Sequence, residues 1–215
     1  MYMPRTRTTA LTALLGIAAL TSCSSGGSGD DAGKPITKQL AQGEITQALP
    51  GTGEVLPGWE LYKGKGVTKE GARCTESKDD ASPKGWVRGG RAWFIYNGST
   101  DNMMDVDICL FDTPENAKSA YTAWKGTESD KEQAPKKQVG EESVFVVNPG
   151  LSENKVDGFS RSGNVNIRVT MQGTGGDTTG VQDILAATLK RLQQVQDGER
   201  ATATAAEQAK KGKKG

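Results

Sequence analysis

Apolar and polar residues alternate in several segments of the chain, and this pattern predicts β-strands. Residues 104–110 and 165–171 each place a large apolar side chain at every second position. Because successive side chains of a strand point to opposite faces, each segment has one apolar and one polar face. Further strands are expected to begin at Trp59 and to cover 92–96, 144–147 and 156–161. The turn sequences Asn97-Gly98 and Ser162-Gly163 would join neighbouring strands into hairpins.

Two other segments repeat apolar residues every three or four positions, which is the period of an amphipathic helix. The first begins at Thr113-Pro114-Glu115, a typical helix start, and ends at Gly126. The second runs from Thr179 to Gly198, and Thr179 with Gln182 fits a capping box. A short helix is also expected within residues 36–49. Hairpins that alternate with helices predict an α+β fold, in which helices pack on an antiparallel sheet within one domain.

Composition divides the chain into four parts. Residues 1–22 contain Arg5 and Arg7 ahead of an apolar run, which is typical of an export signal peptide. Residues 23–35 are rich in Gly, Ser and Asp, so we expect a flexible tether there. Residues 36–198 hold the predicted elements of the globular domain, in which 63–85 form a long polar connection. Residues 199–215 are rich in Ala and Lys and are expected to be a disordered tail.

The end of the leader carries the most specific motif of the sequence. Leu20-Thr21-Ser22-Cys23 resembles the lipobox of bacterial lipoproteins, in which the Cys thiol is joined to diacylglycerol and cleavage leaves that Cys at the N-terminus. The resemblance implies that Cys23 is lipidated and that membrane lipid is one partner of the chain. Two acyl chains hold a protein at a membrane, whereas one holds it only marginally. We therefore expect a lipid-anchored protein on the extracytoplasmic face of the cell membrane.

Charge and composition narrow the possible functions. The chain has 27 Lys and Arg against 26 Asp and Glu, so there is no global positive field to attract nucleic acid. It contains no histidine. Histidine is the commonest general base and metal ligand, and it activates the Ser and Cys nucleophiles of many enzymes. Carboxylates are therefore almost the only catalytic groups that the sequence offers.

The cysteine count predicts one disulfide. If Cys23 carries lipid, Cys74 and Cys109 remain as a pair in an oxidising compartment. A reactive thiol is the alternative, but the chain has no C-x-x-C spacing and no histidine to activate a thiolate. Closing this loop would stabilise the domain by roughly 3–4 kcal/mol in the loop-entropy model.

Two stretches of the domain suggest a relationship. The segments ICLFDTPENAKSAYTAW (108–124) and SRSGNVNIRVTMQ (160–172), the latter followed by an amphipathic helix, resemble the sensor-type domains of actinobacterial kinases and of related small lipoproteins. The resemblance spans about residues 86–192 and implies ligand sensing or partner binding in the cell envelope. It carries no site residues with it.

Several motifs suggest chemistry only at first sight. The glycine-rich segment 173–180 lacks the Lys-Ser/Thr of a phosphate-binding loop, and Ser152-Glu153-Asn154-Lys155 lacks the S-D-N and K-T-G partners of penicillin-binding enzymes. Asp105 and Asp107 share the polar face of one predicted strand, with Asp101 near, and could serve as an acid–base pair or bind Ca²⁺. Exposed strand aspartates are more commonly solvated, so we predict no catalytic residue, metal or cofactor.

Large aromatic residues are the remaining candidates. They could line a groove for a sugar or peptide, although we expect most of them to pack in the core. The set comprises Trp59, Trp86, Trp93, Trp124, Tyr96 and Tyr121. The sequence thus favours a non-catalytic lipoprotein that binds a small ligand or an envelope protein. The alternatives are a carboxylate-dependent envelope hydrolase and a structural or assembly accessory protein.

Overall fold

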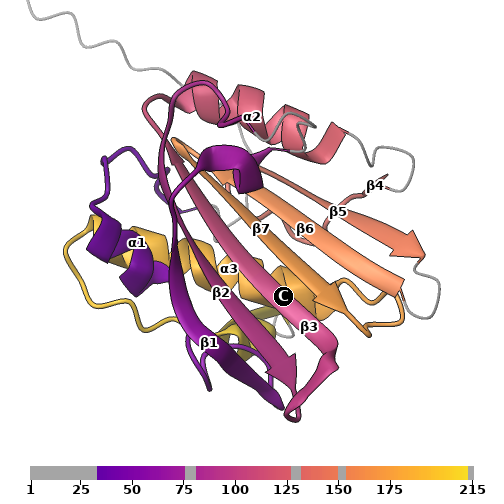
Figure 1. Cartoon of the computed structure of the whole chain (residues 1–215). Helices are drawn as coiled ribbons and strands as arrows, with labels where there is room; N and C mark the ends of the chain where they lie inside the picture. Colours follow the sequence, from indigo (N-terminus) through magenta and orange to yellow (C-terminus); the bar gives the residue numbers. More distant parts are fainter. Residues whose placement is uncertain (1–32, 76–80, 127–131, 150–153, 213–215) are drawn as a thin grey trace, which may run out of the picture.

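The computed structural model describes residues 33–75, 81–126, 132–149 and 154–212. Seven strands form one antiparallel sheet in the order β1-β2-β3-β7-β6-β5-β4 (Figure 1). The strands are β1 (Trp59–Thr68), β2 (Trp86–Tyr96), β3 (Ser99–Phe111), β4 (Glu132–Gln133), β5 (Glu142–Pro149), β6 (Asn154–Ser162) and β7 (Val165–Gln172). The helices are α1 (Gln42–Ala48), the 3-10 helix η1 (Gly71–Cys74), α2 (Pro114–Gly126), α3 (Thr179–Gln196) and α4 (Ala205–Gly212). The fold is therefore α+β, as the sequence predicts.

Two consecutive sets of strands meet at the centre of the sheet. Strands β1, β2 and β3 form one set and β4 to β7 the other, and β3 pairs with β7. The hairpin between β2 and β3 turns at Asn97 and Gly98, whose φ angles are 48° and 75°. Positive φ at both central residues is the geometry of a type I′ turn, which Asn-Gly favours. The predicted hairpins 92–110 and 156–171 are both confirmed.

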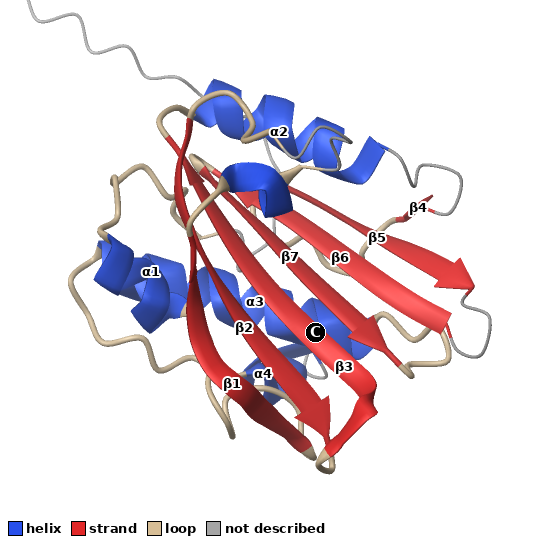
Figure 2. Ribbon diagram, viewed as in Figure 1, coloured by secondary structure: helices blue, strands red, loops and turns tan. Residues whose placement is uncertain are grey.

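The helices cover the two faces of the sheet unequally (Figure 2). Helices α1 and α3 pack on one face, where the main hydrophobic core lies, and α4 packs on α3. On the opposite face, α2 covers a smaller core that includes Trp124, Phe159 and both Cys74 and Cys109. The described helices α2 and η1 lie near one end of this second face. Its remaining part carries charged side chains.

The first strand is longer than the sequence suggests. Residues 63–68 were expected in a long connection, but they continue β1 and pair with β2. The register shifts between Tyr62 and Lys65, where Lys63 has a φ of 60° and Gly64 one of 81°. This bulge interrupts the two-residue alternation by which a strand is recognised. The prediction that 63–85 is a continuous loop is therefore wrong in its first part.

The start of α3 also differs from the prediction. Thr178, and not Thr179, is the N-cap residue, and its side chain makes no capping hydrogen bond. Instead the Thr179 N–H donates to Oδ1 of Asp177 at 2.9 Å. The predicted capping box of Thr179 and Gln182 is absent because Thr179 already belongs to the first turn of the helix.

The C-terminal segment is ordered through Gly212, in contrast to the predicted disordered tail at 199–215. Ala201, Ala203 and Ala205 are buried against the rest of the molecule. Arg191 of α3, itself buried, donates from Nη1 to the carbonyl oxygen of Ala203 at 3.1 Å. Small alanine side chains let this segment approach α3 closely, whereas their low hydrophobicity hides the contact in the sequence. The folded part thus extends beyond the predicted boundary at 198.

At the other end, the predicted tether joins the domain at α3. Gln193 Nε2 donates to the carbonyl oxygen of Lys34 at 3.1 Å, and Gln196 Nε2 donates to that of Pro35 at 3.2 Å. The predicted signal peptide and the lipobox with Cys23 lie outside the described residues. Among the helices within the described ranges, none has the length and apolar character needed to cross a membrane.

Candidate functional site

The second face of the sheet carries several paired charged side chains, and we call this part the polar face. Its centre is β3, from which Asp105 and Asp107 project, as the alternation of residues 104–110 predicts. Arg91 of β2 lies directly opposite Asp107, and Arg168 of β7 lies opposite it on the other side. The sheet register therefore brings two arginines and two aspartates together.

These four side chains form a network of ion pairs. Arg91 Nη2 lies 2.7 Å from Asp105 Oδ2, and Arg91 Nε lies 3.4 Å from Asp107 Oδ1. Arg168 Nη2 donates to Asp107 Oδ2 at 3.2 Å. The Asp107 side chain is only 2% exposed. Burial raises the pKa of Asp107 above its ordinary value, although Arg168 and Arg91 act in the opposite direction.

Both arginines also contact tryptophan rings. The guanidinium carbon of Arg91 lies 4.7 Å from the ring centroid of Trp93, and that of Arg168 lies 4.8 Å from Trp124. Trp124, near the end of α2, is fully buried and meets Phe159 edge-on. A guanidinium over an aromatic face gains cation–π attraction while its N–H groups can still donate to carboxylates in the plane of the group. The rings and the aspartates together fix both arginines in place.

A second group of polar side chains continues the polar face across β6 and β7. Thr170 Oγ1 donates to Asp157 Oδ1 at 2.5 Å, and Lys155 Nζ lies 2.7 Å from Asp157 Oδ2. Asn148 Nδ2 donates to the same carboxylate at 3.3 Å. Asp157 is thus a buried carboxylate with three partners, and it is held in place rather than exposed as a free base.

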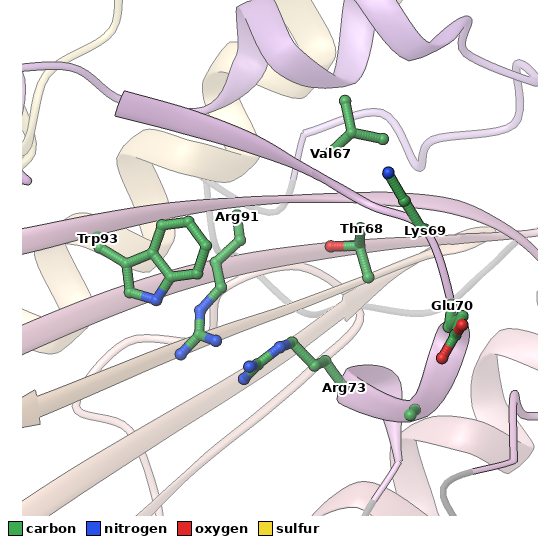
Figure 3. A pocket seen from close by; sticks show the side chains of 8 residues that line it. Val67, Thr68, Lys69, Glu70, Arg73, Arg91 and Trp93 are labelled. Atoms are coloured by element: carbon green, nitrogen blue, oxygen red, sulfur yellow. The ribbon is translucent and has the colours of Figure 1, made fainter. Parts of the chain in front are cut away.

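A pocket of about 290 Å³ opens where the polar face meets η1 (Figure 3). Arg91 and Trp93 of β2 form its floor, and Thr68 and the two residues that follow it form one wall. Arg73 of η1 reaches in from the other side, and Figure 3 shows its guanidinium group pointing toward that of Arg91. We call this space the η1 pocket.

The disulfide holds η1 beside the sheet. Cys74, the last residue of η1, is bonded to Cys109 of β3, and both are buried. The Gly71 N–H donates to Ser82 Oγ at 2.7 Å and fixes the other end of η1. The pairing that the cysteine count predicts is present in the structure. It joins the wall of the η1 pocket to the central strand of the sheet.

The other candidates from the sequence lie elsewhere. Asp101, at the start of β3, accepts a hydrogen bond from Ser99 Oγ and does not join Asp105 and Asp107. Residues 150–153, including Ser152 of the S-x-x-K match, lie outside the described residues, and the glycine-rich segment 173–180 leads into α3. In the described part of the chain, no group of three or more Cys, Asp or Glu side chains is placed to hold a metal ion.

The aromatic residues divide as expected between packing and surface. Trp124 and Tyr121 are buried, and Trp86 packs against the smaller core. Trp59 is also buried and lies 5.4 Å from Tyr96, centroid to centroid. Tyr96 is 40% exposed and lines a second pocket of about 340 Å³ with Asn102, Met171 and Asp177, among others.

Sequence reasoning missed the basic half of the site. Asp105 and Asp107 were identified, but Arg73, Arg91 and Arg168 were not. A signal was present, because Arg168 occupies a polar position of the alternating segment 165–171. Recognising the pairs would have required the register of β3 against both of its neighbours, and β7 follows β3 by more than fifty residues.

The arrangement defines a class of fold: one antiparallel sheet with helices on both faces, consistent with the sensor-type domains that the sequence resembles. A solved structure of this class is the extracellular domain of PknH from Mycobacterium tuberculosis, with a TM-score of 0.54 and 13% sequence identity. The match covers 75% of this chain and 98% of that chain. At this identity the likeness shows the fold alone. No protein-family model matches the sequence, and no curated protein matches it significantly.

Proposed function

We propose that the chain is a non-catalytic, membrane-anchored module of the cell envelope that binds a small ligand or an envelope partner at the η1 pocket. The observation that carries this proposal is the pocket itself. There, charged side chains from β2 and η1 face an open space, and a disulfide holds its wall in place. Binding sites typically combine such a preformed concavity with a few fixed polar groups.

Three observations support an extracytoplasmic location. The lipobox resemblance at Leu20-Thr21-Ser22-Cys23 follows a leader of the export type. The fold is shared with a domain described as extracellular. A disulfide between Cys74 and Cys109 also suits an oxidising compartment.

The geometry of the carboxylates supports a binding role over hydrolysis. A carboxylate-dependent hydrolase needs one carboxyl group to donate a proton and a second to act as base or nucleophile. Asp105 and Asp107 are instead paired with Arg91, and Asp107 with Arg168 as well. Both carboxylates are therefore held by guanidinium groups within the sheet rather than open to a substrate, which supports the binding proposal.

Membrane anchoring is tested by replacing the lipidation site. Cys23→Ala in the full chain should leave the membrane fraction after salt and carbonate washing, whereas the wild type should remain with it. Ser24→Ala, one residue further on, is the matched control and should remain as well. A Cys23→Ala variant that stays with the membranes would overturn the anchoring proposal.

Binding is tested by nuclear magnetic resonance on the full chain in detergent micelles. A fragment set of anionic, neutral and cationic compounds should shift the signals of the Trp93 indole and of Thr68 more than those of residues far from the pocket. If no compound of any charge shifts these signals, the proposed binding role at the η1 pocket is wrong. The assembly alternative would then gain support.

A further inference from the structure

The charges that line the η1 pocket do not balance. Among the described residues of the lining, Lys69, Arg73 and Arg91 carry positive charge and Glu70 alone is acidic. Arg91 is compensated by Asp105 and Asp107 from within the sheet. Arg73 makes no hydrogen bond or ion pair within the described residues, although it lies in a pocket wall and its side chain is exposed. Within the part of the chain that the structure describes, the charge of this arginine is therefore not compensated by an ion pair.

The position of Arg73 is imposed by its neighbours. It precedes Cys74, whose disulfide to Cys109 ties η1 to β3. At the other end of η1, a Cβ on Gly71 would lie 2.8 Å from Cβ of Ser82, so that residue has no room for a side chain. The backbone of η1 is thus fixed at both ends and places Arg73 beside the pocket, where its guanidinium group points toward that of Arg91 (Figure 3).

Two arginines that face the same space repel each other unless an anion lies between them. Arg91 is oriented in advance by Asp105 and by the ring of Trp93. Guanidinium groups bind carboxylate and phosphate oxygens through pairs of parallel N–H donors, which are stronger than hydrogen bonds between neutral groups. An oxyanion would therefore complete the site.

The remaining walls of the pocket are less polar. Trp93, Val67 and Ala72 contribute apolar surface, and Val67 is 53% exposed. The pocket volume of about 290 Å³ corresponds to a small organic molecule rather than a polymer segment. The bound species thus combines an anionic group with a compact uncharged part.

We infer that the η1 pocket binds a compact organic oxyanion, a phosphate or carboxylate on a small uncharged body, between Arg73 and Arg91. This inference rests on the proposed function and specifies its ligand class. The oxyanion belongs either to a free metabolite or to the headgroup of a phospholipid, because both present the same group to the arginines.

The test compares pairs of probes that differ in charge. Glycerol 3-phosphate with glycerol, and benzoate with benzyl alcohol, are titrated into the full chain while the Trp93 indole signal is followed. Each anion should bind at least tenfold more tightly than its neutral analogue, and rising salt should weaken it. A second comparison identifies the source of the oxyanion, with short-chain phosphatidylglycerol as the probe and phosphatidylcholine of equal chain length as its control. If phosphatidylglycerol binds more tightly than glycerol 3-phosphate, the oxyanion belongs to a lipid headgroup. If it binds more weakly, the oxyanion belongs to a free metabolite.

Substitution of Arg73 provides the second arm. Arg73→Gln should weaken anion binding roughly tenfold, because a charge-assisted hydrogen bond is lost. Arg73→Lys should bind the anions with an affinity between those of the wild type and Arg73→Gln, since it keeps the charge and loses the planar pair of donors. Arg200→Gln, at an exposed residue outside the pocket, is the control and should bind as the wild type does.

The outcomes separate this inference from the proposed function. If neutral probes shift the pocket signals as strongly as the anions, and Arg73→Gln changes nothing, the oxyanion inference is overturned while the binding role stands. If neither the probes nor any compound of the fragment set shifts these signals, both fail.

Discussion

Asp107 lies between two arginines at the centre of the sheet and is almost completely buried. Burying charged groups costs several kcal/mol each, and their mutual attraction offsets this only where the geometry is good. The network therefore adds little net stability as a whole, while each member depends on the others. Its effect is to hold Arg91 in a fixed orientation beside the η1 pocket, which a solvated arginine would not have.

Removing the Asp107 carboxylate should therefore destabilise the folded protein. We expect Asp107→Ala to lower the free energy of unfolding by about 3 kcal/mol, because Arg168 and Arg91 remain buried with too little negative charge. Asp105→Ala should cost less, since the Asp105 side chain is 20% exposed and water can replace it. Urea denaturation of both variants measures the difference.

Asp101→Ala serves as the control for this series, because its side chain is exposed and bonded only locally. It should unfold at the wild-type urea concentration. Equal stabilities for the Asp107→Ala and Asp101→Ala variants would show that the ion-pair network does not form in solution.

At the residue scale, the sequence identified the aspartates and the cysteine pair but not their partners. Cys74 and Cys109 could be paired by elimination, since so few cysteines are present. Arg91 could not be assigned to Asp107, because the pair depends on how β2 and β3 align after the turn at Asn97-Gly98. One residue of slippage would move every side chain of a strand to the other face.

At the scale of whole elements, local signals placed helices more accurately than strand ends. Helix α2 begins at Pro114 and ends at Gly126 as predicted, because Thr113, Pro114 and Gly126 are local start and stop signals. Strand β1 was truncated in the prediction, since its second half owes its structure to pairing with β2 across a bulge. Tertiary pairing of this kind leaves no pattern within the strand itself.

A side-chain hydrogen bond at the start of α3 should contribute to the stability of the protein. Asp177 accepts the Thr179 N–H, and these hydrogen bonds lower the pKa of its carboxyl group. Asp177→Ala should destabilise the protein by about 1 kcal/mol at pH 7, the usual cost of losing such a contact at a helix start. Thermal or urea unfolding measures this loss.

The effect of Asp177 should depend on pH in a defined direction. Its pKa is lower in the folded than in the unfolded protein, so its stabilising contribution is fully present above the unfolded value and is lost as pH falls through the folded value. The difference between wild type and Asp177→Ala should therefore shrink below about pH 4. Asp177→Asn keeps an acceptor and should retain part of the stability at pH 7. A difference that stays constant down to pH 2 would contradict this role.

At the scale of the molecule, both ends of the described chain meet on α3. The segment that leads from the predicted anchor is bonded to Gln193 and Gln196, near the C-terminal end of α3. Arg191 connects the same helix to α1 and to the C-terminal segment, through the carbonyl oxygens of Ala48 and Ala203. Helix α3 therefore links the N-terminal attachment to the core on one face. The polar face and the η1 pocket remain open on the other.

The packing of the C-terminal segment can be tested with two neighbouring alanines. Ala205 is fully buried, whereas Ala206 is exposed, and both lie in the first turn of α4. Ala205→Asp would place a charge in an apolar contact, so we expect it to lower the free energy of unfolding by about 3 kcal/mol or to release α4. Ala206→Asp should be nearly neutral, because its charge stays in water and an acidic residue is favourable near a helix start.

The two variants have the same composition and charge, so only the position of the substitution distinguishes them. Urea denaturation gives the two stabilities, and proteolysis of the native protein reports whether residues 199–212 have become accessible. A disordered tail, as the sequence alone suggests, would make both substitutions neutral and leave the segment equally sensitive to protease in all three proteins. Ala205 also donates its N–H to the carbonyl oxygen of Glu54 at 3.0 Å. Glu54 Oε2 in turn lies 3.1 Å from Arg191 Nη2. Because Arg191 connects α3 to α1, release of α4 should in addition loosen the contact between these two helices.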